Sequence, residues 1–203
     1  RAPGSAATPA DVPAVVLGSL SIGGTVVASG SLEGGAGATA NDRLQIAFEG
    51  TVDCEGDESA TRVTVVNSYQ VTNTGDLVCT GSLPPSGSTT PEVVNTTANG
   101  VVLMSGVDSF QVLYGIDNNP NEVANVRRYV TASQIGTNPV LAIRVGILMR
   151  SDNPGIADMS TTIRGFTVLD KTLTGGNAPL DEQGIRRLFV TTVQLRNFDP
   201  DLI

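Results

Sequence analysis

The sequence predicts a β-rich domain of largely antiparallel strands joined by many loops. Three observations support this prediction. Val and Thr are abundant beside 23 Gly and 11 Pro residues in a chain of 203, a composition that favours strands and turns. Residues 141–149 alternate with the period of two that a strand requires. No stretch of the sequence has the pattern of a long amphipathic helix.

The first 40 residues are rich in Gly, Ala, Ser and Pro. Residues 14–17 and 25–28 are short apolar pieces between glycines. We expect extended segments or short strands there, because the glycines interrupt any helical period. The sequence therefore divides into a Gly/Ala-rich extension, residues 1–40, packed on a β-rich domain, residues 41–203.

Five strands are expected in the next part of the chain. Asn41-Asp42 precedes the first, and the turn-forming run Asn73-Thr74-Gly75-Asp76 joins the second and third into a hairpin. A Pro/Ser/Thr-rich loop, residues 81–97, precedes the fourth. The five predicted strands are 44–48, 61–71, 77–79, 101–104 and 107–114.

The last third of the chain contains the clearest strand. Leu141, Ile143, Val145, Ile147 and Met149 alternate with Ala142, Arg144, Gly146 and Leu148, which predicts a central place in a sheet. Residues 127–135 form a short helix or an irregular link, and residues 167–169 a short strand. The final strand, 187–196, has Phe189, Thr191, Val193 and Leu195 on one face.

The composition excludes several functions. The chain has no His and two Cys, so it cannot build a Ser-His-Asp or Cys-His nucleophile, a His-containing zinc site or a Cys₄ site. Its net charge of −8 argues against strong direct nucleic-acid binding. The densest apolar stretch, 139–149, is interrupted by Arg144 and is too short to span a bilayer. We expect no catalytic residues and no cofactor.

The two cysteines, Cys54 and Cys79, allow a single pairing. An exported protein would form a disulfide, whereas a cytosolic protein would keep two reduced, buried thiols. The pI of about 4.4, the single Lys and the Ser/Thr/Asn-rich loops favour an extracytoplasmic protein.

One segment has the odd-position spacing of a calcium loop: Asp117, Asn119 and Asn121. Glu122 stands where such a loop needs Gly, and Arg128 stands where it needs a bidentate Glu. The sequence therefore favours an Asx-rich turn at these positions. Calcium binding is the weaker alternative.

Four carboxylates lie within six residues: Asp53, Glu55, Asp57 and Glu58. Paired carboxylates can perform acid–base or glycosidase chemistry, but this requires a cleft and different environments for the two groups. A run of acids beside Cys54 is more typical of a solvated turn.

The arginines of the last third are expected to form surface ion pairs with the many acids. Such pairs contribute about 0–1 kcal/mol each. The arginines concerned are Arg144, Arg150, Arg186, Arg187 and Arg196.

Several segments between residues 41 and 197 resemble one protein family and occur in the order found in that family. They are 41–44, 53–56, 67–71, 77–79, 101–117, 128–132, 140–151 and 186–197. The most specific are the Arg-Arg-x-Phe-x-Thr-Thr-Val-x-Leu-Arg-Asn run at the end and the strand that contains Arg144. In this combination the segments resemble the PilW-type minor pilins of bacterial type IV pili.

The resemblance implies an α+β, pilin-like fold with a mostly antiparallel β headgroup. Members of this family begin with a short basic leader and a long hydrophobic helix, which anchors the subunit in the membrane and packs on the headgroup sheet. We expect that helix to precede Arg1, with the extension of residues 1–40 following it. The membrane would then be contacted only through this helix.

The resemblance also implies a Cys54–Cys79 disulfide that ties residues 53–56 to the strand near Leu77. It implies a non-enzymatic role in initiating pilus assembly with other minor pilins, the major pilin and a tip adhesin. The subunit would lie at the periplasmic face of the inner membrane before assembly and in the pilus afterwards. The alternatives are a secreted β-sandwich adhesin or a carbohydrate-binding module, for which the three Tyr and five Phe are few, and an acid-dependent hydrolase.

Overall fold

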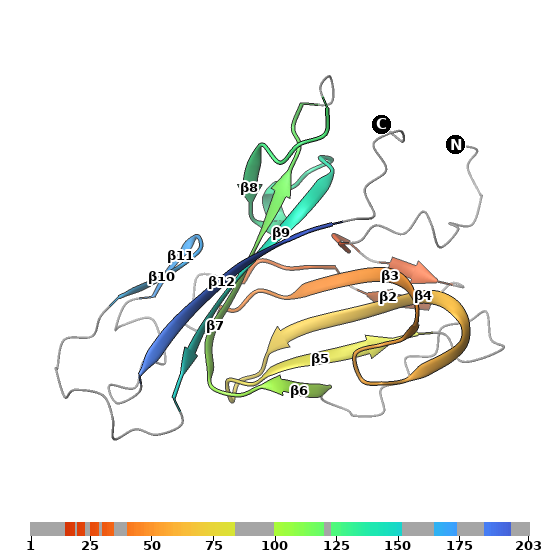
Figure 1. Cartoon of the computed structure of the whole chain (residues 1–203), viewed down its shortest axis with the longest axis horizontal. Helices are drawn as coiled ribbons and strands as arrows, with labels where there is room; N and C mark the ends of the chain where they lie inside the picture. Colours follow the sequence, from red (N-terminus) through yellow and green to blue (C-terminus); the bar gives the residue numbers. More distant parts are fainter. Residues whose placement is uncertain are drawn as a thin grey trace. The chain divides into compact units, whose positions relative to one another are not determined.

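The computed structural model describes residues 15–18, 20–22, 25–28, 30–34, 40–83, 100–119, 123–151, 165–173 and 185–195 (Figure 1). The predicted antiparallel β architecture is confirmed, and the one helical element in these ranges is a single 3₁₀ turn. The chain divides into two compact units, each built from separate stretches. The first unit contains Arg1–Ser31, Leu44–Tyr69 and Val78–Val101. The second contains Leu32–Arg43, Gln70–Leu77 and Val102–Ile203.

The first unit contains β3 and most of β4 and β5, which are neighbours in a four-stranded sheet of order β3-β4-β5-β6 (Figure 1). The strands are β3 (Leu44–Val52), β4 (Glu58–Val71), β5 (Leu77–Ser82) and β6 (Val101–Met104). β3 and β4 form an antiparallel hairpin in which Phe48 lies opposite Val65. Val65, Val66, Val78 and Cys79 are buried. The predicted strands at 44–48 and 61–71 are present, and both extend further along the loop between them.

Two further elements of the first unit come from the Gly/Ala-rich region. β1 (Leu20–Ile22) and β2 (Thr25–Ala28) form an antiparallel pair, so the short strand expected at 25–28 is confirmed. Val15 bridges Ile46 of β3, and the N–H of Val16 donates to the carbonyl of Gln45 at 2.9 Å. The division of the chain at residue 40 stays a prediction.

The second unit contains a four-stranded sheet in the order β12-β9-β7-β8 (Figure 1). Its strands are β7 (Val107–Ile116), β8 (Arg128–Val130), β9 (Val140–Arg150) and β12 (Arg186–Gln194). β9 lies between β7 and β12, as its alternation predicts. Ile143 of β9 lies opposite Tyr114 of β7 and Val193 of β12.

A small hairpin packs on β9. It consists of β10 (Phe166–Val168) and β11 (Lys171–Leu173), and Val168 and Leu173 bury themselves against Leu148 of β9. Gly146 makes this approach possible, because a Cβ there would lie 2.9 Å from Cγ of Leu169. The strand predicted at 167–169 begins and ends one residue earlier. Leu169 has a φ of 56° and starts the turn.

The helix or irregular link predicted at residues 127–135 contains two short elements. β8 pairs with Tyr114–Ile116 of β7. It is followed by the 3₁₀ turn η2 (Ala132–Gln134). Three residues are too few to show a period of two, which is why the sequence pattern did not distinguish β8 from a link.

Toward the start of β7, two polar residues take the place of a neighbouring strand. Asn41 Oδ1 accepts the N–H of Phe110 at 2.7 Å. Asp42 Oδ2 accepts the N–H of Val112 at 2.7 Å, and the N–H of Asp42 donates to the carbonyl of Phe110 at 2.9 Å. We call this pair the β7 edge cap. It satisfies backbone groups that would be costly to bury unpaired.

Candidate functional site

β12 exposes a row of apolar side chains in the described part of the chain. Phe189 is 48% exposed and Val193 is 52% exposed. They lie opposite Ile147 and Ile143 of β9, and directly opposed residues share one face of a sheet. We call these four residues the β12 face. Ile143 is buried and Ile147 is half-buried, so Phe189 and Val193 form the exposed part of this face. Exposed apolar patches mark sites of interaction.

One of the predicted surface arginines is buried, which corrects the prediction. The side chain of Arg186 is 7% exposed and its Nε lies 2.8 Å from Oδ2 of Asp108, which is itself buried. Arg150 Nη1 lies 3.6 Å from the other oxygen of Asp108. The sequence did not indicate Asp108, because an acid next to a strand valine is usually a surface residue. The two arginines meet it through the strand register, which places Arg186 opposite Arg150.

Two other arginines contact aromatic rings. The guanidinium of Arg144 lies 3.8 Å from the centroid of the Tyr129 ring, and its Nε donates to Thr192 Oγ1 at 3.2 Å. The guanidinium of Arg187 lies 5.5 Å from the centroid of the Phe189 ring. Cation–π contacts of this kind contribute about 0.5–1 kcal/mol at exposed sites. Arg196 lies outside the described residues.

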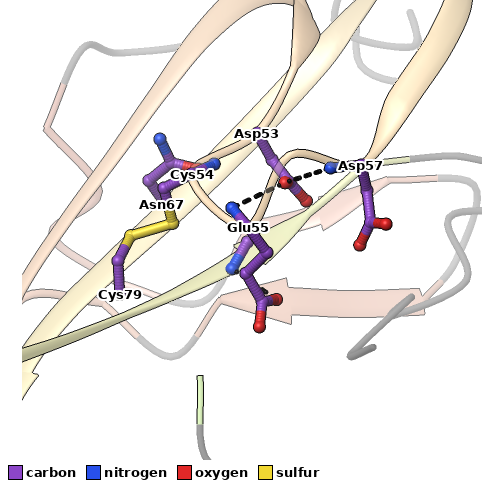
Figure 2. The surroundings of a disulfide bond; sticks show 7 residues. Asp53, Cys54, Glu55, Asp57, Asn67 and Cys79 are labelled. Atoms are coloured by element: carbon purple, nitrogen blue, oxygen red, sulfur yellow. Dashed lines mark hydrogen bonds between the residues drawn. A yellow bond between two sulfur atoms is a disulfide. The ribbon is translucent and has the colours of Figure 1, made fainter. Parts of the chain in front are cut away.

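The structure contains the Cys54–Cys79 disulfide, with the two Cα atoms 6.2 Å apart (Figure 2). Cys79 is fully buried in β5. The N–H of Cys54 donates to Oδ1 of Asn67 in β4 at 3.2 Å. The bridge thus fixes the β3–β4 loop to β5, two elements that are separated in sequence by the whole of β4.

The acidic loop beside Cys54 differs from the solvated turn that the sequence predicts. Asp53 is only 7% exposed, and Glu55 and Asp57 are half-buried. Oδ1 of Asp53 accepts the N–H groups of Glu55 at 2.9 Å and Asp57 at 3.0 Å (Figure 2). Oε2 of Glu55 accepts the N–H of Gly81 in β5 at 3.0 Å. Glu58 is exposed, as predicted.

Asp117, the first residue of the calcium-like segment, is bound by groups of the protein. Its Oδ1 accepts the N–H of Asn119 at 2.9 Å and lies 3.0 Å from Nε of Arg127. Its Oδ2 accepts the N–H of Asn125 at 3.0 Å. The backbone N–H groups, and then Arg127, lower the pKa of Asp117. Asn121 lies outside the described residues, so calcium binding to Asp117, Asn119 and Asn121 stays a prediction.

Sequence reasoning did not identify an acidic pair in the second unit, which consists of half-buried Glu33 and buried Asp42. Burial, followed by the nearby carboxylates of Asp42 and Asp170, raises the pKa of Glu33 to about 7. Burial also raises the pKa of Asp42, against the hydrogen bonds that it accepts from Gly34 and Val112. The dipeptide Asn41-Asp42 before the predicted strand was the sequence feature that could have indicated Asp42.

The hollow beside the turn at Thr72–Gly75 is small. It has a volume of about 80 Å³ and is lined by Asp108 and Arg150, among other residues. Ligand pockets usually enclose about 300–1,000 Å³. It is therefore too small for a typical organic substrate.

The sequence model of one family, described as Type IV Pilus-assembly protein W, matches residues 59–197. The chain belongs to this PilW family. A type IV-like pilin from Thermus thermophilus has a similar solved structure, with 19% identity, a TM-score of 0.45, and coverage of 82% of this chain and 83% of that chain. No curated protein matches the sequence.

The resemblance to PilW-type proteins is therefore confirmed, and membership indicates a role in type IV pilus assembly at the cell envelope or in the pilus. The match includes β7, β9 and β12, and therefore the β12 face. It also includes Cys79 in β5, and Asp117, which directly follows β7. The acidic loop at residues 53–57 precedes the match. Among the residues that the structure describes, no helix is long and apolar enough to cross a membrane.

Proposed function

We propose that this PilW-family protein is a minor pilin that helps to initiate type IV pilus assembly. It would act without catalysis, in a complex with other minor pilins, the major pilin and a tip adhesin. It would lie at the periplasmic face of the inner membrane before assembly and enter the pilus afterwards. Family membership supports the assembly role.

The observation that carries this proposal is the β12 face. Phe189 and Val193 are about half exposed beside Ile143 and Ile147. Full burial of a Phe or Val side chain contributes about 1.5–3 kcal/mol relative to full exposure, so a partner that covers this face gains affinity there. An apolar helix fits such a face, and it would complete the α+β pilin fold that the family resemblance implies.

Two valines of β12 provide a matched test. Val193 belongs to the β12 face, whereas Val190 lies on the opposite face of the same strand and is 51% exposed. In cells that lack the native gene, we expect Val193→Asp to reduce the number of surface pili at least tenfold and Val190→Asp to reduce it less than threefold. Electron microscopy counts the pili, and affinity capture of the tagged protein measures the minor pilins bound.

Equal piliation by the two variants, at equal protein levels, would contradict a role for the β12 face. Failure of the wild-type protein to capture any other minor pilin would contradict the assembly complex. The gene sequence upstream of Arg1 gives a second test. A short basic leader followed by about 20 apolar residues is expected, and a cleavable secretory signal directly before Arg1 would favour a secreted adhesin instead.

A further inference from the structure

The loop between β3 and β4 brings three carboxylates together. Asp53, Glu55 and Asp57 each offer an oxygen, and the three oxygens lie within 4.8 Å of one another. The N–H of Asp53 donates to the carbonyl of Asp57 at 3.1 Å, which closes the loop, and Gly56 turns it with a φ of 89°. Figure 2 shows the three side chains around the loop beside the disulfide.

A second observation concerns the buried oxygen of Asp53. Oδ1 of this carboxylate accepts two N–H groups, whereas Oδ2 is buried and, among the described residues, has no hydrogen-bond partner. Leaving a buried charged acceptor unsatisfied is costly. The residue is 7% exposed, so bulk solvent does not compensate for the missing partner.

Gly81 of β5 shows where this oxygen points. A Cβ at Gly81 would collide with Oδ2 of Asp53. The N–H of the same glycine donates to Oε2 of Glu55 at 3.0 Å. The unsatisfied oxygen of Asp53 and the carboxylate of Glu55 therefore both lie against Gly81 of β5.

From these observations we infer that Asp53, Glu55 and Asp57 form a binding site for a divalent cation of the calcium type. The donors are oxygens alone, which hard cations prefer. Two oxygens on opposite sides of one Ca²⁺ lie about 5 Å apart, since each Ca–O distance is about 2.3–2.6 Å. One ion can therefore contact all three carboxylates. Mg²⁺ loses its water less readily and requires a regular octahedron, so calcium fits this irregular loop better.

The disulfide preorganises the site. Cys54 stands between Asp53 and Glu55 in sequence, and its bond to Cys79 holds the loop against β5. Binding therefore requires little ordering of the loop. Three protein carboxylates at a half-exposed loop correspond to the weaker calcium sites of extracellular modules, with Kd about 10⁻⁴–10⁻³ M.

The test is calcium binding to the oxidised full chain after treatment with a chelator. Isothermal titration with CaCl₂ is expected to give one site with Kd about 0.1–1 mM. Raising CaCl₂ to 10 mM is expected to raise the melting temperature by about 3–11 °C, whereas MgCl₂ raises it by less than half as much. Wild-type protein that binds no calcium up to 10 mM would overturn the site.

Isosteric variants locate the ion. Asp53→Asn keeps an oxygen for the two N–H groups and removes the charge, and Glu55→Gln keeps an acceptor for Gly81. Each is expected to weaken calcium binding at least tenfold. Glu58→Gln removes the same charge from the adjacent exposed position, and its Kd should stay within twofold of the wild-type value.

A second set of outcomes separates this site from the Asp117 segment. If Asp117→Asn abolishes calcium binding while Glu55→Gln leaves it intact, the ion binds at Asp117 and the inference is wrong. An equal loss in Glu58→Gln and Glu55→Gln would show that net charge alone attracts the ion. If Asp53→Asn fails to fold, Glu55→Gln and Asp57→Asn decide the question.

Discussion

At the scale of single residues, burial changes what the acidic side chains do. Asp42, Asp53 and Asp108 are all buried, yet each has a different set of partners. Asp42 accepts backbone N–H groups at a strand edge, Asp108 pairs with Arg186 and Arg150, and Asp53 lies in the acidic loop. An acidic chain therefore uses part of its charge to organise the interior of its units.

Glu33 makes the stability of the protein depend on pH. Its pKa is raised to about 7 by burial and by Asp42 and Asp170, so the folded state holds the proton more tightly than the unfolded state does. The stability of the wild-type protein therefore falls as the pH rises from about 4.5 to about 7. Glu33→Gln removes this titration. We expect it to be nearly neutral at pH 5 and stabilising by about 1 kcal/mol at pH 8, a value reduced for partial exposure.

Urea unfolding of both proteins across this pH range measures the difference. Glu49→Gln is a suitable control, because Glu49 is exposed and lies 3.9 Å from exposed Arg62. The difference between this control and the wild-type protein should stay below about 0.5 kcal/mol. A difference between Glu33→Gln and wild type that does not grow between pH 5 and pH 8 would contradict the raised pKa.

The residue types in the sequence predict only part of what the acidic side chains do. The absence of histidine excludes His-dependent nucleophiles and His-containing zinc sites, because that exclusion needs no geometry. The burial of Asp53 depends on Gly81, a residue of another strand that leaves room for the carboxylate. The Asp108–Arg186 pair likewise depends on contacts across 78 residues. Local sequence carries no signal for either arrangement.

At the scale of elements, the β10–β11 hairpin depends on a single small residue. At Gly146→Ala the new methyl group would lie 2.9 Å from Leu169 Cγ and 3.0 Å from Val168 Cγ1. The hairpin must shift away from β9, which loosens its contact with Leu148. We expect a loss of about 1–3 kcal/mol in the free energy of unfolding, measured by chemical denaturation.

Gly18→Ala is the matched substitution, because a Cβ at Gly18 meets no atom within 4 Å. That variant should stay within about 0.5 kcal/mol of wild type. If both variants lose the same stability, the loss is not specific to Gly146, and the close packing of the hairpin is not its cause.

Strand prediction succeeded where a strand was long enough to show its period. The central place of β9 followed from its alternation over residues 141–149, and β7 was found with nearly its full length. β8 and β11 have three residues each, and tertiary pairing rather than local pattern determines them. The position of β12 was predicted correctly. Its sequence does not indicate that the side chains on both of its faces are largely exposed.

At the scale of the whole molecule, the disulfide is the main covalent constraint. It closes a loop with a sequence separation of 25, and the chain-entropy treatment assigns about 3 kcal/mol to such a loop. Reduction should lower the melting temperature by about 6–12 °C for a protein of this size. Thiol titration of the unreduced, denatured protein should find no free thiol.

The double variant Cys54→Ala/Cys79→Ala provides the control for this measurement. It should melt at the same lower temperature with and without reductant. Two titrating thiols in the unreduced wild-type protein would contradict the bridge. A wild-type melting temperature that reductant leaves unchanged, with complete reduction shown by titration, would contradict its contribution to stability.

The β7 edge cap also bears on the time course of folding. Asn41 and Phe110 are 69 residues apart in sequence, Asp42 and Val112 are 70 apart, and the carbonyl of Ala40 accepts Lys171 Nζ across 131 residues. Long-range contacts form slowly, because the chain must close large loops before they contribute. The start of β7 therefore acquires its cap only after the chain has closed loops with sequence separations of 69 and 70, and until then it presents an unprotected strand edge to other chains.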